Sequence, residues 1–396
     1  MGRRLENLEQ FGIDVVLERR HGFRARILRG ILYALSFIYE RLVQLRLYLY
    51  RKRLFRERSL GCLVISIGNL TVGGTGKTPI VEKFARALQL GGRQVAILSR
   101  GYKSVPRRRN WLDRLRRKDA DPPRVVSDGK SLLLDSLTAG DEPYMLAHNL
   151  KDVIVLVDKD RVKSGRLAID KWNVDTLLLD DGLQYLHLKH RLDIVLVDRQ
   201  APFGNEFLLP RGTLREAPRN LRRASYIFIT KNTGEPNDVL IQRIRRYNRT
   251  AEIIECAHKP LYLQNVYTGE QLPLEHLHDA FIGSICGIAA PESFEGGLKK
   301  LGAHVDLAKR YIDHHRYSEA ELQSFINRCI RRDLQMIVTT EKDAVRMPRL
   351  AGSELGVPIC FLRVEIEILS GHESWEHCVA RICKPQPMLS PERFFA

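Results

Sequence analysis

The chain has 396 residues, of which 44% are hydrophobic, and this composition is typical of a globular protein rather than a disordered one. Its 64 Lys and Arg residues exceed its 47 Asp and Glu residues and give a formal net charge of +17, which favours an anionic partner such as nucleic acid, acidic lipid or a phosphorylated substrate. The seven cysteines are scattered and contain no CxxC pair, so neither a disulfide framework nor a zinc site is indicated and a reducing environment fits best.

Residues 1–59 form a basic segment with helical spacing. Residues 1–20 lack the apolar core of a secretory signal. Between residues 19 and 58, twelve Arg or Lys residues are interleaved with apolar positions at helical spacing: Leu28, Leu32, Leu35, Ile38, Leu42, Leu45 and Leu49. The uncharged run 30–39 is far shorter than the roughly 20 residues that cross a bilayer. We therefore predict an amphipathic helix lying on a membrane surface, with packing against the protein's own core as the alternative.

Short apolar runs rich in β-branched residues alternate with helical stretches from residue 60 onward. This alternation predicts βαβ units and a doubly wound parallel sheet, with strands at residues 62–67, 95–98, 153–157, 176–179, 194–197 and 226–230. The stretch 259–279 contains two prolines and a glycine and is interpreted as a linker. A second set of strands follows at residues 281–286, 336–339 and 359–364. We thus predict an α/β fold with a first domain at 60–258 and a smaller α/β domain at 280–396.

A glycine-rich segment carries the strongest chemical signal. The sequence GNLTVGGTGKTP spans residues 68–79, directly after a predicted strand and directly before the helical run 80–90. Glycines let backbone N–H groups turn toward phosphate oxygens, and a helix N-terminus favours negative charge. We expect ATP or GTP to bind in a P-loop NTPase-like domain, on Thr71, Val72, Gly73, Gly74, Thr75, Gly76, Lys77 and Thr78. Lys77 would reach the β and γ phosphates and Thr78 would bind Mg²⁺. Thr71 stands where the GxxxxGK[ST] pattern has its first glycine.

Two adjacent acids close the predicted strand 176–179. Asp180 and Asp181 precede Gly182, and a P-loop site needs a carboxylate near the metal at the end of a neighbouring strand. We expect one acid to serve Mg²⁺ and the other to serve the nucleotide or the substrate. Two solvated loop acids are the alternative.

Other polar clusters allow structural or functional interpretations. Taken alone, Asp141 resembles a helix N-cap, and the pair Arg215 and Glu216 could be a surface ion pair. His314 lies in a loop before a predicted helix, where it could act as a base or orient one. The segment 103–118 carries eight Arg or Lys residues and is expected to be an exposed loop that could bind acidic headgroups.

Seven motifs in this order resemble one family, the tetraacyldisaccharide 4'-kinases of lipid A biosynthesis. The motifs are GNLTVGGTGKTP, SRGY, GDEPYMLA, LDDGLQ, LPRGTLREA, DHHRYS and TTEKDAV, between about residues 60 and 364. The resemblance implies ATP-dependent, Mg²⁺-requiring phosphorylation of the 4'-hydroxyl of a tetraacylated glucosamine disaccharide 1-phosphate, at the cytoplasmic face of an inner membrane. The sequence contains no recognised nucleic-acid-binding motif, so no nucleic-acid partner is expected.

The resemblance also implies roles for individual residues. Asp141 would act with His314 to activate the sugar hydroxyl, while Lys77 holds phosphate. Thr78, Asp181 and Glu216 would surround the metal, and Asp180 and Arg215 would contact the substrate. A nucleic-acid-stimulated ATPase and a membrane-bound nucleotide switch without transfer activity remain the alternatives.

Overall fold

The computed structural model describes residues 11–12, 14–102, 104–105, 121–350 and 356–384. The basic segment predicted at 103–118 lies, apart from 104–105, outside these residues. One mixed sheet runs through the molecule, in the order β11-β10-β12-β13-β8-β7-β6-β1-β5-β2-β4-β3, with β9 paired to β8. The strands are β1 (Leu63–Asn69), β2 (Val95–Ser99), β3 (Arg124–Asp128), β4 (Ile154–Val157), β5 (Thr176–Asp180), β6 (Leu192–Asp198), β7 (Tyr226–Thr230), β8 (Glu252–Asn265), β9 (Gln271–Leu272), β10 (Phe281–Cys286), β11 (His304–Arg310), β12 (Met336–Thr340) and β13 (Ile359–Ser370).

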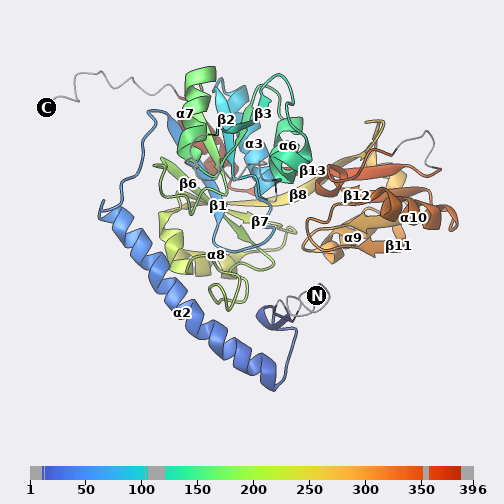
Figure 1. Cartoon of the computed structure of the whole chain (residues 1–396), viewed down its shortest axis with the longest axis horizontal. Helices are drawn as coiled ribbons and strands as arrows, with labels where there is room; N and C mark the ends of the chain where they lie inside the picture. The colour runs from blue at the N-terminus through green and yellow to red at the C-terminus, as the bar shows by residue number, and fades with distance from the viewer. Residues whose placement is uncertain (1–10, 13, 103, 106–120, 351–355, 385–396) are drawn as a thin grey trace, which may run out of the picture.

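The first half of the sheet is parallel from β4 to β8 and has helices on both faces (Figure 1). The six strands predicted there are confirmed to within two residues at each end. Side chains alternate between the faces: Ile65 and Ile67 of β1 pack with α3 (Lys77–Leu90), α6 (Asp141–Asn149) and α12 (His372–Cys383), whereas Val64 packs with α7 (Arg161–Trp172). This large, mostly parallel sheet confirms the predicted α/β class. The short antiparallel strand β3 was not predicted.

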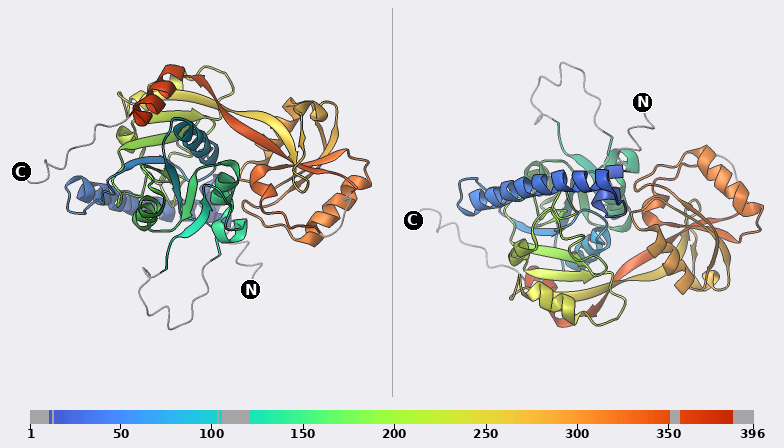
Figure 2. Two further views of the ribbon diagram at one scale, coloured as in Figure 1. Left: turned by 90° about the horizontal axis from the view of Figure 1, so that it is seen from above. Right: turned by 90° about the horizontal axis from the view of Figure 1, so that it is seen from below.

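The two halves of the molecule are joined by the long strands β8 and β13 (Figure 2). They pair antiparallel from Cys360↔Asn265 to Ser370↔Glu255. The first part of the stretch 259–279, which was predicted to be a linker, is a strand, because β8 continues to Asn265. Pro260 lies beside a register shift in the pairing, where a proline that cannot donate to the ladder is tolerated. The separation into two domains stays a prediction.

The second half continues the sheet with β12, β10 and β11, all parallel. The three predicted strands are present, and β13 extends six residues beyond the predicted end at 364. Leu298 of α9 (Pro291–Lys300) and Phe325 of α10 (Glu319–Ile330) lie in separate apolar clusters, one on each face. Helix α10 begins with a capping box between Ser318 and Glu321, which fixes the end of the preceding loop.

The predicted N-terminal helix is present as α2 (Phe23–Arg51), which runs along one side of the first half (Figure 1). Its inner face is held by the Ser36 hydroxyl, which donates to the Leu208 carbonyl over 2.7 Å, and by the Tyr39 hydroxyl, which donates to the Arg215 carbonyl over 3.0 Å. None of the helices in the described part of the chain contains a stretch long and apolar enough to span a bilayer. The remaining helical segments are α5 (Ser136–Ala139), α8 (Asp238–Arg245), α11 (Glu341–Ala344), η1 (Pro218–Arg223) and η2 (Leu274–Leu277).

Candidate active site

The glycine-rich segment forms the turn between β1 and α3 that its sequence predicts. Strand β1 ends at Asn69 and α3 begins at Lys77, with Gly73 and Gly76 at φ values of 118° and 79°, in the region where side chains are strained. A Cβ placed on Gly73 or Gly74 would meet nothing within 4 Å, so this side of the turn is open to a ligand. The turn therefore has the form of a phosphate-binding cradle at a helix N-terminus.

Lys77 and Asp181 form an ion pair across this cradle. Their Nζ and Oδ1 atoms are 3.2 Å apart, and Lys77 also donates to Asn69 Oδ1 over 3.1 Å. Asp181 leaves the strand direction with a φ of 57° and accepts a second cation, Arg215, at 2.7 Å. Burial raises the pKa of Asp181, but the Lys77 and Arg215 cations outweigh it and hold the pKa below its usual value. Asp181 is thus a carboxylate that organises two cations beside the phosphate cradle.

Asp180 lies in a different environment at the end of β5. Its side chain is buried, Oδ2 accepts a hydrogen bond from the Ser99 hydroxyl over 3.0 Å, and among the described residues no group is bonded to Oδ1. Burial, with the nearby Glu142 and Asp181 carboxylates, raises the pKa of Asp180 to about 7. An unpartnered, buried carboxylate oxygen next to a phosphate cradle is suited to a cation. The alternative of two solvated loop acids is wrong.

Arg215 and Glu216 lie next to the cradle because Arg215 N donates to the Leu70 carbonyl over 2.6 Å. Their interpretation as a surface ion pair is wrong, since Glu216 is only 3% exposed and Arg215 pairs with Asp181. The Glu216 carboxylate is instead surrounded by three donors, which are Arg223 at 2.7 Å, Asn220 at 2.8 Å and Gln184 at 3.1 Å.

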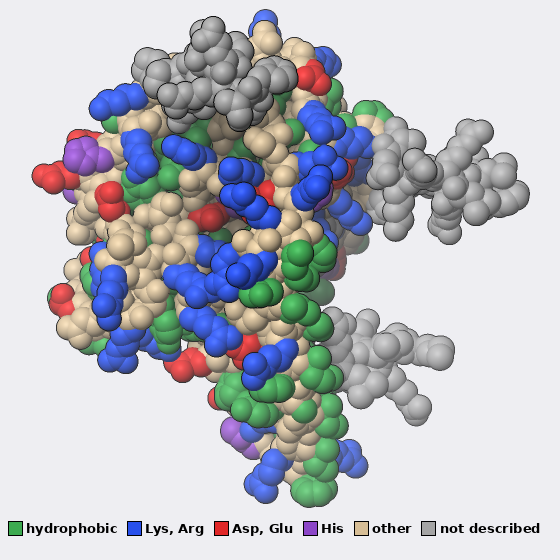
Figure 3. Space-filling view, turned by 90° about the vertical axis from the view of Figure 1, so that its left-hand side faces the viewer, with side chains coloured by type: hydrophobic (Ala, Val, Ile, Leu, Met, Phe, Trp, Pro, Cys, Tyr) green, Lys and Arg blue, Asp and Glu red, His purple; other side chains and the backbone are tan. Residues whose placement is uncertain are grey.

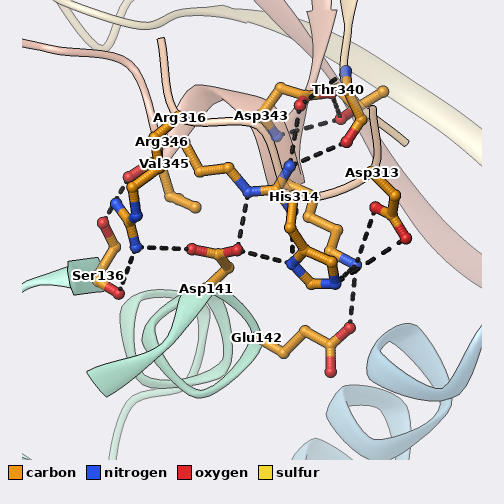
Figure 4. A network of polar contacts seen from close by, with 12 residues as sticks. Ser136, Asp141, Glu142, Asp313, His314, Arg316, Thr340, Asp343, Val345 and Arg346 are labelled. Atoms are coloured by element: carbon orange, nitrogen blue, oxygen red, sulfur yellow. Dashed lines mark hydrogen bonds and ion pairs between the residues drawn. The ribbon is translucent and has the colours of Figure 1, made fainter. Parts of the chain in front are cut away.

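Asp141 and His314 meet between the two halves of the molecule (Figure 4). The N-cap interpretation of Asp141 is wrong, because Gly140 is the N-cap of α6. Asp141 is the first residue of the helix, and its side chain is buried. Asp141 Oδ2 lies 3.0 Å from His314 Nδ1 and accepts a hydrogen bond from Arg346 Nε over 2.8 Å, while Oδ1 accepts one from Arg316 over 3.1 Å. Burial raises the pKa of Asp141, but His314 and the two arginines outweigh it and keep the pKa below its usual value. The carboxylate is therefore ionised near neutral pH.

The contact with Asp141 favours one tautomer of the His314 ring. An ionised Asp141 accepts a proton from Nδ1, and this leaves Nε2 as the acceptor. Consistent with this assignment, Lys342 Nζ, a donor, lies 3.4 Å from Nε2. The His314 ring therefore lies between the Asp141 carboxylate at Nδ1 and the Lys342 ammonium group at Nε2. Lys342 also pairs with Glu142 at 3.2 Å. The neighbouring His315 instead contacts Glu321 at 3.3 Å and stacks on Tyr311.

The structure brings together residues to which the sequence analysis assigned no role. They are Asn69, Ser99, Arg316, Lys342 and Arg346. Four of them lie inside the motifs on which the family resemblance rests, and this position was the only indication in the sequence that they could belong to the site. Arg346 follows the motif TTEKDAV directly, and an arginine in sequence gives no indication that it will be buried.

Comparisons with known proteins agree with this geometry. The family model described as LpxK, tetraacyldisaccharide-1-P 4'-kinase, matches residues 28–384. The chain is 38% identical over 371 residues to a tetraacyldisaccharide 4'-kinase of Syntrophus aciditrophicus, covering 89% of this chain and 93% of that protein. It is 34% identical over 360 residues to one from Halothermothrix orenii, covering 87% of this chain and 89% of that protein.

A solved structure of LpxK from Aquifex aeolicus in complex with ATP superposes with a TM-score of 0.67 at 28% sequence identity. The match covers 90% of this chain and 99% of that one, so the whole architecture is shared and not the phosphate loop alone. The chain belongs to the tetraacyldisaccharide-1-phosphate 4'-kinase family, the phosphotransferases of lipid A biosynthesis.

Proposed function

We propose that the protein binds ATP on residues 71–78 and transfers its γ-phosphoryl group to the 4'-hydroxyl of a tetraacylated glucosamine disaccharide 1-phosphate held at a membrane surface. The observation that carries this proposal is the contact between Asp141 and His314, 3.0 Å apart. A carboxylate and imidazole pair next to a phosphate cradle is suited to accept a proton from an alcohol. Lys342 and Glu142 connect the pair to the cradle, because Glu142 is close enough to Asp180 to raise its pKa.

ATP binding follows from the open glycine turn and from Lys77. Backbone N–H groups of the turn and the N-terminus of α3 favour phosphate oxygens. Lys77 is held toward the cradle by Asn69 and Asp181, so its ammonium group is pre-positioned for the β and γ phosphates. Arg215 adds a second cation on the same side through Asp181 and would contact the anionic lipid.

The donor set also fits Mg²⁺, a hard cation that prefers oxygen ligands and usually takes one or two carboxylates with phosphate oxygens. Asp180 has a buried oxygen without a partner among the residues that the structure describes, and Thr78 follows Lys77 in the first turn of α3. We favour these two residues as ligands. Asp181 and Glu216, which the resemblance assigned to the metal, are already engaged by two cations and by three donors. When bound, the ion supplies neutralisation of charge on the phosphates.

The transfer step needs positioning and removal of one proton. The 4'-oxygen attacks the γ-phosphorus, the bond from that phosphorus to the β–γ bridging oxygen breaks, and ADP leaves with the bonding electrons. The hydroxyl proton passes to the pair of Asp141 and His314. Since Asp141 is ionised and Nε2 of His314 is the acceptor nitrogen, the pair is ready to take this proton.

Helix α2 supports the membrane surface as the place of reaction. Its outer face carries a stripe of half-exposed apolar side chains, seen at the edge of the molecule with Lys and Arg nearby (Figure 3). The stripe consists of Ile27, Ile31, Leu35, Ile38, Leu42 and Leu45. An amphipathic helix of this kind can insert its apolar face among lipid headgroups while cations meet acidic lipid. A substrate with four acyl chains stays in the bilayer, so the enzyme has to reach it there.

The test is transfer of labelled γ-phosphate from ATP and Mg²⁺ to a detergent-solubilised tetraacyl disaccharide 1-phosphate. Asp141→Ala and His314→Ala should each lower the rate by roughly 10² to 10⁴-fold, the contribution of general base catalysis, with nucleotide binding retained. His315→Ala is the matched control and should keep its rate, because His315 contacts Glu321 and not Asp141. An intact protein that binds ATP but transfers nothing would contradict the proposal and favour a switch. ATP turnover that is stimulated by DNA or RNA would favour the nucleic-acid alternative.

A further inference from the structure

Arg346 is a fully buried cation directly behind the Asp141 and His314 pair. The exposed fraction of its side chain is 0%, although arginine is rarely buried without partners. Nε donates to Asp141 Oδ2 over 2.8 Å, and Nη1 donates to Asp343 Oδ1 over 3.1 Å and to the Gly287 carbonyl over 3.0 Å. Nη2 lies 3.3 Å from His314 Nδ1. One guanidinium group therefore touches both members of the pair and a rigid anchor (Figure 4).

The anchor is itself firmly held. The Asp343 side chain accepts hydrogen bonds from the Tyr317 hydroxyl over 3.0 Å and from the Thr340 hydroxyl over 2.6 Å, and it receives the Gly287 N–H over 3.0 Å. Gly287 follows β10, Thr340 is the last residue of β12, and Tyr317 lies at the end of the loop before α10. Arg346 thus links this anchor in the second half of the molecule to Asp141, the first residue of α6 in the first half.

The two oxygens of the Asp141 carboxylate have different hydrogen-bond partners. Oδ2 is shared by His314 and the fully buried Arg346, whereas Oδ1 is bonded to Arg316, whose side chain is 36% exposed. Because Oδ2 accepts the Nδ1 proton of His314, the donor that fixes Oδ2 also fixes the direction of the imidazole ring and its tautomer.

We propose that Arg346 is a positioning residue for phosphoryl transfer, which holds Asp141 Oδ2 in place so that His314 presents Nε2 to the acceptor hydroxyl. This inference rests on the proposed role of Asp141 and His314. Arg346 acts through Asp141 and needs no contact with substrate. A purely structural role, neutralising Asp141 and Asp343, would also make Arg346 important for stability, so stability alone does not separate the two roles.

The pH dependence of kcat separates them. Removing the Arg346 cation makes Asp141 easier to protonate, so the acidic limb of the kcat profile should move to higher pH in Arg346→Met. We also expect kcat at neutral pH to fall roughly 10 to 100-fold, part of what a general base contributes, with the KM for ATP within about twofold of the unchanged enzyme. Arg346→Lys keeps the charge but loses the planar fork that reaches Asp141, Asp343 and Gly287 together, so it should restore the acidic limb more than it restores kcat.

Arg363→Met is the matched control. Arg363 is another buried arginine in the same half and pairs with Glu82 and Glu341, away from Asp141. It should lower the thermal midpoint as Arg346→Met does but leave the acidic limb in place. A double variant with Asp141→Asn should be no slower than Asp141→Asn alone, because two residues that act through one group are not additive.

The inference is overturned if Arg346→Met loses stability like Arg363→Met but keeps its kcat and its acidic limb, or if its effect adds fully to that of Asp141→Asn. If Arg346→Met does not fold, Arg346→Lys and Asp343→Asn, which loosens the anchor, take its place, and an unchanged kcat in both would overturn the inference. If Asp141→Asn itself keeps the full transfer rate, the proposed function of the pair fails and the inference fails with it. Loss of transfer in Asp141→Asn with no effect at Arg346 rejects the inference alone.

Discussion

His314 Nδ1 lies 3.0 Å from Asp141 Oδ2, although the two residues are separated by 173 positions in the chain. Asp141 begins α6 in the first half of the molecule, and His314 follows β11 in the second half. The paired strands β8 and β13 run from one half to the other, so a continuous sheet connects the two halves that carry Asp141 and His314. The site therefore depends on correct pairing of two long strands that contribute no residue to the chemistry.

Lys77→Ala should lower kcat/KM for ATP by at least about 100-fold, because it removes a pre-positioned charge from the phosphates and leaves Asp181 with Arg215 as its cation. The measurement is phosphate transfer together with titration of a fluorescent ATP analogue. Lys83→Ala, on the same helix but packed over the Trp375 ring, is the control and should behave as the unchanged protein. Equal nucleotide affinity in Lys77→Ala would contradict the assignment of the cradle.

Asp180 should make the ligand-free protein less stable as the pH rises from about 4 to 7. Its pKa is about 7 in the folded state and near the ordinary 3.8 when unfolded, so within this window the unfolded chain has lost a proton that the folded chain keeps. The free energy of unfolding then falls with pH by on the order of 1 kcal/mol per unit from this group. Asp180→Asn removes this pH dependence. The free energy of unfolding of the variant, relative to that of the unchanged protein, should therefore increase as the pH rises from 5 to 7.

Urea unfolding at pH 5, 6, 7 and 8 measures this difference. Asp181→Asn is the matched control, since the pKa of Asp181 is held below its usual value and its contribution is lost only as the pH falls through the acidic range. The difference between Asp181→Asn and the unchanged protein should be constant over the measured range. A constant difference for Asp180→Asn would show that Asp180 is already ionised in the folded protein.

The sequence was sufficient to predict the elements that follow local rules. Strand β10 has exactly the predicted bounds, and β1, the glycine turn and α3 follow in the predicted order, because apolar runs and glycines act on their own neighbourhoods. The continuation of β8 past Pro260 could not be predicted, since it depends on a partner strand about one hundred residues later. The burial of Arg346 and of the Asp180 carboxylate likewise depends on elements that only the fold brings together.

The apolar stripe on α2 should be required for binding to anionic vesicles. Replacing Ile38 and Leu42 by glutamate removes two side chains that are 55% and 60% exposed, whose transfer into lipid is worth roughly 2–4 kcal/mol together. We expect vesicle partition in sedimentation assays to fall by at least about tenfold and the KM for lipid to rise, with the KM for ATP unchanged. Val239→Glu, at an 83% exposed apolar position on α8, is the control. Unchanged partition of the double variant would contradict the assignment of α2 as the membrane contact.

A buried ion network ties the phosphate-binding helix to the second half of the sheet, and its removal should be costly. Arg363, on β13, pairs with Glu82 of α3 and, at 2.8 Å, with Glu341 of α11. Arg363→Met leaves these two carboxylates facing each other without their shared cation, and breaking a buried pair in this way costs about 3–5 kcal/mol. The free energy of unfolding in urea should fall by that amount, and adding Glu341→Gln should restore part of it because one unpaired charge is then gone. A loss below about 1 kcal/mol, or a double variant less stable than Arg363→Met, would mean that water replaces the arginine and that this network contributes little to holding the two halves together.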